Sequence, residues 1–155
     1  MIYFPSTSSY PRFMDDVLFG IENDKMKYQL KVDCLFSFHN LKLTDFKDEL
    51  GRFEIYNLSN GKEVNETMFK IKKGTQFDGV TGGADYDNRM MFALVHDCAC
   101  WATEQSEDHS YRDALNNQAY SIVRAQGGGW WNAKATSWAV KRYSKHLKKV
   151  GKYVG

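Results

Sequence analysis

The stretch Phe92-Ala-Leu-Val-His-Asp-Cys-Ala-Cys-Trp101 places two ionisable residues, His96 and Asp97, inside an otherwise apolar segment. Apolar residues recur at positions i, i+3, i+4 and i+7 counted from Met91, which is the period of a helix face. The spacing predicts a central helix that is apolar on nearly every side. Burying an ionisable group without a hydrogen-bonding partner is unfavourable, so we expect the rest of the fold to supply partners for the pair.

Two more helices are predicted after this one. Ser110 is a suitable N-cap for the second helix, and Gly127-Gly-Gly129 is a suitable end for it. A third helix is predicted from about Asn132 to Lys149. Its expected apolar face consists of Ala135, Trp138, Ala139, Tyr143 and Leu147.

The first half of the chain alternates apolar and polar residues, which predicts strands at 26–38, 41–46, 52–58 and 67–73. The sequence Ser59-Asn-Gly-Lys62 predicts a tight turn that joins the last two strands as a hairpin. We therefore expect residues 26–150 to form a single α+β domain. In it a small, mostly antiparallel sheet from the N-terminal half packs against about three helices from the C-terminal half.

Residues 1–25 contain both prolines and several aromatic side chains, which predicts an irregular N-terminal arm with one short helix. Such an arm packs on a partner or across its own domain, or it is a loosely attached terminus. We expect Tyr3, Phe4, Tyr10 and Phe13 to form an interface together with Trp130 and Trp131, which follow the three glycines. Burial of at least one of the two tryptophans is also expected.

Composition limits the possible classes of protein. The chain has 155 residues, of which 43% are hydrophobic, as expected for one folded globular domain. Its apolar runs are too short to span a bilayer, and its first residues do not resemble a signal peptide. The odd number of cysteines disfavours a disulfide scaffold, and Cys98 and Cys100 would point apart on a helix, which disfavours a zinc site.

Charge is distributed unevenly along the chain. Residues 114–155 contain eight Lys/Arg and no Asp or Glu, whereas residues 1–113 contain 13 Lys/Arg and 19 Asp/Glu, a balance of −6. A basic segment of this kind binds an anionic partner or docks on the acidic part of its own chain or of a neighbouring copy. Nucleic acid is the weaker prediction for Lys141 to Lys152, because no aromatic motif for stacking single strands accompanies these lysines.

The best candidate site combines Asp78, which lies in the glycine-rich segment Phe77 to Gly83, with His96 and Asp97. Three interpretations are open. Asp78 would orient His96 as a general base, the three residues would bind a metal ion, or they would form a buried hydrogen-bond network. No serine or cysteine has the setting of a catalytic nucleophile.

Several neighbouring residues are expected to support such a network without taking part in chemistry. Either Asn116 or Asn117 is expected to face His96 across the helix pair, because asparagine is a poor residue for a helix interior. The supporting residues predicted for the network are Thr81, Arg112 and Asn117.

The order of motifs resembles a domain family of unknown function that is common in tailed bacteriophages and prophages. The resemblance rests on Phe77-Asp-Gly-x-Thr81, on Val95-His-Asp97, on Asn117 placed three residues before Tyr120, and on a helix containing Ala135 to Tyr143. It covers roughly residues 27 to 145. Where members of the family carry a later aspartate, this chain carries Asn117, which would weaken a metal or acid–base site.

The resemblance implies a phage context but no reaction. We therefore expect a virion or assembly protein, tail- or neck-associated, that is made in the host cytoplasm and then built into the particle. Its expected partners are other phage structural proteins or a second copy of itself. The alternative is a small hydrolase that uses His96, Asp97 and Asp78. No cofactor is expected, although the hydrolase would allow a divalent metal.

Overall fold

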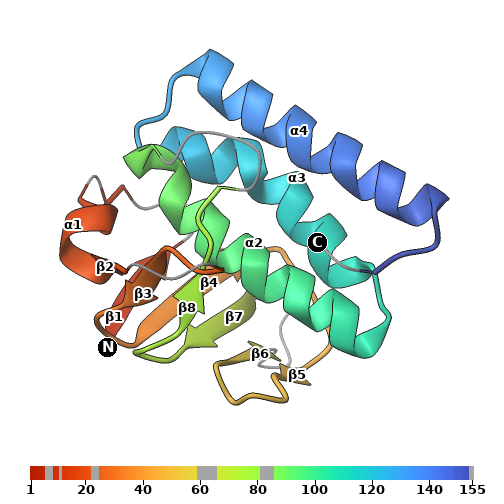
Figure 1. Cartoon of the computed structure of the whole chain (residues 1–155), viewed down its shortest axis with the longest axis horizontal. Helices are drawn as coiled ribbons and strands as arrows, with labels where there is room; N and C mark the ends of the chain where they lie inside the picture. Colours follow the sequence, from red (N-terminus) through yellow and green to blue (C-terminus); the bar gives the residue numbers. More distant parts are fainter. Residues whose placement is uncertain (6–8, 11, 22–24, 59–65, 81–85, 154–155) are drawn as a thin grey trace.

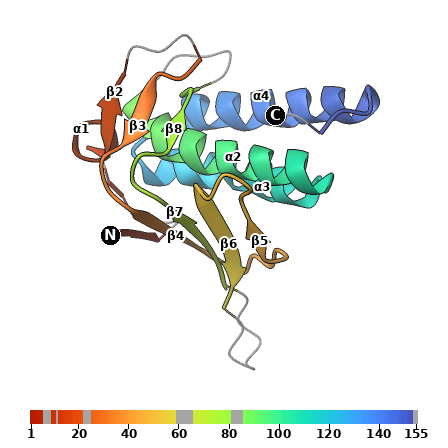
Figure 2. The same ribbon diagram turned by 60° about the horizontal axis from the view of Figure 1, so that its bottom comes forward.

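The computed structural model describes residues 1–5, 9–10, 12–21, 25–58, 66–80 and 86–153 (Figure 1). In Figure 2 the five-stranded sheet lies below the three long helices, and the three-stranded sheet lies beside one end of them. The predicted α+β fold is confirmed. Strands fill the N-terminal half, and the long helices fill the C-terminal half.

The larger sheet has five strands in the order β1-β4-β7-β6-β5. Every neighbouring pair in it is antiparallel except β1 and β4, so the sheet is mostly antiparallel, as predicted. The predicted turn 59–62 lies outside the described residues, but the strands on either side of it do pair as a hairpin. The five strands are β1 (Ile2–Pro5), β4 (Cys34–His39), β5 (Phe46–Lys47), β6 (Phe53–Asn57) and β7 (Glu66–Ile71).

A second sheet of three short strands interrupts the long strand predicted for 26–38. It contains β2 (Leu18–Gly20), β3 (Tyr28–Leu30) and β8 (Gln76–Phe77), all antiparallel. Between β3 and β4 the chain passes from one sheet to the other. Two backbone groups in this connection form hydrogen bonds with neither β3 nor β4. Lys31 N donates to Val17 O, and Asp33 O accepts from Ile2 N. A strand was predicted for 41–46, but only the last of these residues, Phe46, lies in a strand, which is β5.

The N-terminal residues belong to the fold rather than to an irregular arm. β1 pairs in parallel with β4, which places Phe4 beside Phe36 at a ring distance of 4.9 Å. Phe13 lies in α1 (Phe13–Val17) and packs against Phe4 at 5.5 Å. Phe4 and Phe13 are 1% and 0% exposed, so the interface role predicted for them is wrong. Pro5 is tolerated because it ends an edge strand.

The three long helices are α2 (Asp87–Ser106), α3 (Ser110–Ala125) and α4 (Trp130–Lys149). α2 is buried along most of its length, as its sequence predicts, and contacts the sheet through Trp101, which packs on Phe53. α4 packs on α3 and lies on the side away from the five-stranded sheet (Figure 2). None of the described helices is long and apolar enough to cross a membrane.

The packing of β1 leads to the first prediction. Replacing Phe4 by alanine removes a buried ring from the core and is expected to reduce the free energy of unfolding by about 3–5 kcal/mol. The matched control is Phe19→Ala, because Phe19 is a phenylalanine of the same N-terminal segment that is 52% exposed. The control is expected to change stability by less than about 1 kcal/mol. Urea denaturation measures the free energy of unfolding of both variants. An equal loss in the two would contradict the described packing of β1.

Candidate functional site

Asp97 fastens α2 to the end of the second sheet. The backbone N–H of Asp78, directly after β8, donates a hydrogen bond to the Asp97 carboxyl group. Burial raises the pKa of Asp97 to about 8 against the opposing effect of this hydrogen bond, and the charge of Asp78 acts in the same direction as burial. The carboxyl group is therefore mostly protonated at neutral pH. It acts as a neutral hydrogen-bonding group, and the Asp78 main chain supplies its partner.

His96 fastens the same helix to α3. Its Nε2 lies 2.8 Å from the side-chain oxygen Oδ1 of Asn116, and its ring packs against Phe92 at 5.1 Å. Because Oδ1 is an acceptor, Nε2 carries the proton and donates it. Burial lowers the pKa of His96 to about 4, and the charge of Arg112 acts in the same direction. The ring is thus neutral at pH 7, with its proton on the nitrogen that faces α3.

The three candidate residues therefore do not form one constellation. Neighbouring residues of a helix point about 100° apart, and here His96 turns toward α3 while Asp97 turns toward the residue after β8. The predicted pairing of Asp78 with His96 is wrong, since the hydrogen-bond partner of the ring is Asn116. The network interpretation describes these contacts best. Thr81, predicted to support the network, lies outside the described residues.

The surroundings of His96 do not favour a nucleophile or a metal centre. The second ring nitrogen, Nδ1, lies 3.7 Å from Cys100 Sγ. Burial raises the pKa of the Cys100 thiol to about 12, so this sulfur stays protonated and is a poor nucleophile at neutral pH. Within the described ranges, no group of three His, Cys, Asp or Glu side chains is placed to hold a metal ion.

Arg112 is the centre of a second network, and none of its hydrogen bonds to described residues joins it to His96, whose network it was predicted to support. Its side chain is buried and donates hydrogen bonds to Ser144 Oγ at 3.2 Å and to the carbonyl oxygen of Tyr153 at 2.9 Å. One of its terminal nitrogens also lies 2.8 Å from His109 Nδ1. Arg112 thus ties α3 to α4 and to the C-terminal residues, and it holds positive charge beneath the surface between these helices.

The two asparagines of α3 have different positions. Asn116 is 3% exposed and binds His96, which confirms that one of the pair faces the histidine. Asn117, which takes the place of the family aspartate, is exposed and lines a pocket between α3 and α4. Among the described residues, no hydrogen bond joins Asn117 to the His96 network. The supporting role predicted for Asn117 is therefore wrong.

The outward face of α4 is the most unusual surface of the molecule. Trp130, Trp131 and Trp138 are 45%, 76% and 61% exposed, so the expected burial of Trp130 or Trp131 is wrong. Trp131 and Trp138 are seven residues apart and therefore share one side of the helix. Lys134 lies over the Trp130 ring at 4.6 Å, and Arg142 lies over the Trp138 ring at 4.9 Å. We call these three tryptophans and two cations the tryptophan face.

The predicted apolar face of α4 is largely wrong. The side of α4 that packs on α3 is built mainly from small and polar residues, so the apolar period pointed to the wrong side of the helix. Of the residues predicted to face inward, only Leu147 is buried, and Tyr143 is 49% exposed. The residues of α4 that are buried are Ala133, Thr136, Ser144 and Leu147.

Trp138 is the interface candidate that sequence analysis missed. Its spacing of seven residues from Trp131, on a helix with six Lys/Arg and no acid, was the available signal. Of the predicted aromatic interface residues near the N-terminus, Tyr3 is exposed but its hydroxyl lies 2.7 Å from Ser37 Oγ. Tyr10 is half-buried against Phe4. The exposed aromatic surface is therefore concentrated on α4.

Comparison with known proteins assigns no activity to this arrangement. No protein-family model, no curated protein and no solved structure matches the chain. The resemblance to a phage family rests on the motifs of the chain itself and stays a prediction. A function has to be argued from the contacts and surfaces described above.

The pKa values of His96 and Asp97 predict how stability depends on pH. Between about pH 4 and 6.5 the unfolded chain protonates His96 while the folded chain does not, so this residue makes the fold more stable as pH rises. Folded Asp97 keeps a proton that the unfolded chain releases above pH 3.8, which has the opposite effect up to about pH 8. Above pH 6.5 only Asp97 contributes, and stability should fall.

Asp97→Asn tests directly whether Asp97 lowers stability as pH rises. The asparagine amide stays neutral at every pH and still accepts a hydrogen bond from the Asp78 N–H. Relative to the original chain, the variant should gain stability as pH rises from 6.5 to 8, measured as melting temperature at each pH. Asp87→Asn, at the exposed start of the same helix, is the control. A difference in melting temperature between the variant and the original chain that stays constant over this range would show instead that folded Asp97 is ionised.

Proposed function

We propose that this chain is a phage-encoded assembly protein that binds an acidic surface of a partner protein through the tryptophan face of α4. The observation that carries the proposal is the exposure of three tryptophans on one helix that contains no acidic residue. Large exposed apolar side chains of this kind are concentrated at protein interfaces, where Trp and Arg supply most of the binding energy. The phage context comes from the sequence resemblance.

Charge indicates the chemistry of the partner. α4 carries six Lys/Arg and no Asp or Glu, so its outward side attracts a negatively charged surface. A protein partner is favoured over single-stranded nucleic acid because cations already occupy faces of two of the rings on which bases would stack. A virion protein or a second copy of the chain is a suitable partner, since residues 1–113 have a charge balance of −6.

The geometry gives less support to the hydrolase alternative. The ring of His96 is neutral and hydrogen-bonded to Asn116, and Asp97 is bound by a main-chain amide on another side of the helix. An acid–base mechanism needs both groups at one position beside a substrate. The described contacts instead use each group to hold α2 in place.

Incorporation into particles tests the proposal. Trp131→Ala combined with Trp138→Ala should reduce the amount of the chain in purified phage particles by at least about tenfold, because interface tryptophans contribute about 2 kcal/mol or more each. Quantitative mass spectrometry of particles measures this. The fold should persist, since both side chains are exposed, and circular dichroism checks that it does.

The matched control is Leu50→Ala, which removes a side chain that is 75% exposed and lies outside α4. It should leave incorporation unchanged. Complete absence of the chain from particles would refute the virion role. Normal incorporation of the double variant would refute the tryptophan face as the docking surface, and binding of a deoxythymidine oligomer that the double tryptophan variant abolishes would refute the class of partner.

A further inference from the structure

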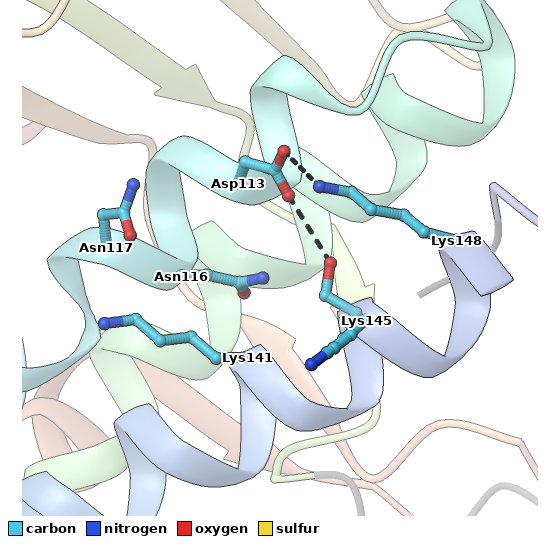
Figure 3. Close-up of a pocket in the computed structure, with 7 residues that line it drawn as sticks. Asp113, Asn116, Asn117, Lys141, Lys145 and Lys148 are labelled. Atoms are coloured by element: carbon cyan, nitrogen blue, oxygen red, sulfur yellow. Dashed lines mark hydrogen bonds and ion pairs between the residues drawn. The ribbon is translucent and has the colours of Figure 1, made fainter.

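A pocket of about 320 Å³ lies between α3 and α4, next to the His96 network and apart from the tryptophan face. Figure 3 shows that α3 supplies one wall and α4 the other. This volume lies at the lower end of the range for small-molecule sites. Six side chains that line it are Asp113, Asn116, Asn117, Lys141, Lys145 and Lys148.

The pocket has an excess of positive charge. Three lysines and one aspartate line it, which gives a formal charge of +2. Lys148 is neutralised by Asp113, to which its Nζ lies 2.6 Å away, and in Figure 3 it points toward that carboxylate. Lys141 and Lys145 have no ion-pair partner in the part of the chain that the structure describes. Two ammonium groups are therefore available to a ligand.

A buried amide adds a directed donor to these charges. Asn116 is 3% exposed and lines the pocket, and its Oδ1 is occupied by the N–H of His96. Its Nδ2 makes no hydrogen bond to any described residue and is not a buried atom without a partner, so this donor is accessible to solvent. In Figure 3 the Asn116 side chain lies on the α3 wall, whereas Lys141 extends from α4 toward Asn117 and Lys145 lies further along α4.

The contact with His96 also fixes which end of the amide is presented. Because Oδ1 accepts from Nε2, Nδ2 is the end of the amide that stays free to donate. The positive charge of Arg112, buried at the base of the same helix pair, adds to the field at this place. Asn116 lines the pocket from α3, and Lys141 and Lys145 line it from α4, so both walls supply hydrogen-bond donors.

We propose that this pocket binds a phosphate group, with Lys141 and Lys145 supplying charge and Asn116 Nδ2 supplying a neutral hydrogen bond. Separate donors around a centre suit a tetrahedral oxyanion, whereas a planar carboxylate is best matched by the paired N–H groups of a guanidinium. Lysine binds phosphate as a point charge. A mononucleotide and a nucleic-acid backbone are two sources of the same group, and the proposal does not depend on the function proposed for the tryptophan face.

Calorimetric titration of the full chain with inorganic phosphate, with adenosine monophosphate and with a deoxythymidine oligomer tests the proposal, at matched ionic strength. Adenosine is the probe that lacks phosphate. Lys141→Ala and Lys145→Ala should each weaken binding of a phosphate-containing probe by about tenfold. Both side chains are exposed, so the fold is expected to persist.

Two further variants separate the pocket from general charge. Lys149→Ala removes an exposed lysine of the same helix that does not line the pocket, and it should leave the affinity within about twofold. Asn116→Asp keeps an acceptor for His96 but replaces the Nδ2 donor by negative charge, so it should abolish binding.

Binding of the mononucleotide or of the oligomer that depends on Lys141 and Lys145 but not on Lys149 supports the pocket, and the stronger of the two identifies the source of the phosphate. The proposal is overturned if no phosphate-containing probe binds at millimolar concentration. It is equally overturned if adenosine binds as well as its monophosphate, or if Lys149→Ala weakens binding as much as Lys141→Ala.

Discussion

The hydrogen bond from His96 Nε2 to Asn116 Oδ1 determines how the helical half of the molecule is arranged. It joins two helices that together carry about half of the core, and it satisfies the only histidine of α2, whose middle is otherwise apolar apart from Asp97. Because the ring is neutral, it donates without bringing a charge into the interior. The same bond orients the Asn116 amide and so connects the core with the pocket between α3 and α4.

Asp97 completes the attachment of α2 on another side. By accepting the N–H of Asp78 it links the helix to the three-stranded sheet, while His96 links it to α3. An adjacent pair of ionisable residues, which suggests an active site in sequence, is used here to hold one helix between two neighbours. The exposed tryptophans and the unpaired lysines are displaced from this core to α4, where binding does not disturb it.

Periodic segments were predictable from sequence, and long-range placements were not. The spacing from Met91 predicted α2, and alternation predicted β6 and β7, because each pattern reflects one face buried locally. β1 was missed because its pairing with β4 joins residues about thirty positions apart and leaves no local pattern. On α4 the buried side is made of small and polar residues such as Thr136 and Ser144, so apolar periodicity selected the wrong side. For the site, helix pairing predicted that Asn116 or Asn117 would face His96, whereas the choice of Asn116 and the separation of Asp78 from His96 depended on tertiary placement.

The protonation state of His96 tests the central claim most directly. A long-range ¹⁵N–¹H spectrum recorded across a pH series reports which ring nitrogen carries the proton and where the ring titrates. A neutral ring protonated at Nε2, with a pKa near 4, is the predicted result. A ring protonated at Nδ1, or one that titrates near its ordinary value of 6.5, would contradict the proposed attachment of α2 to α3.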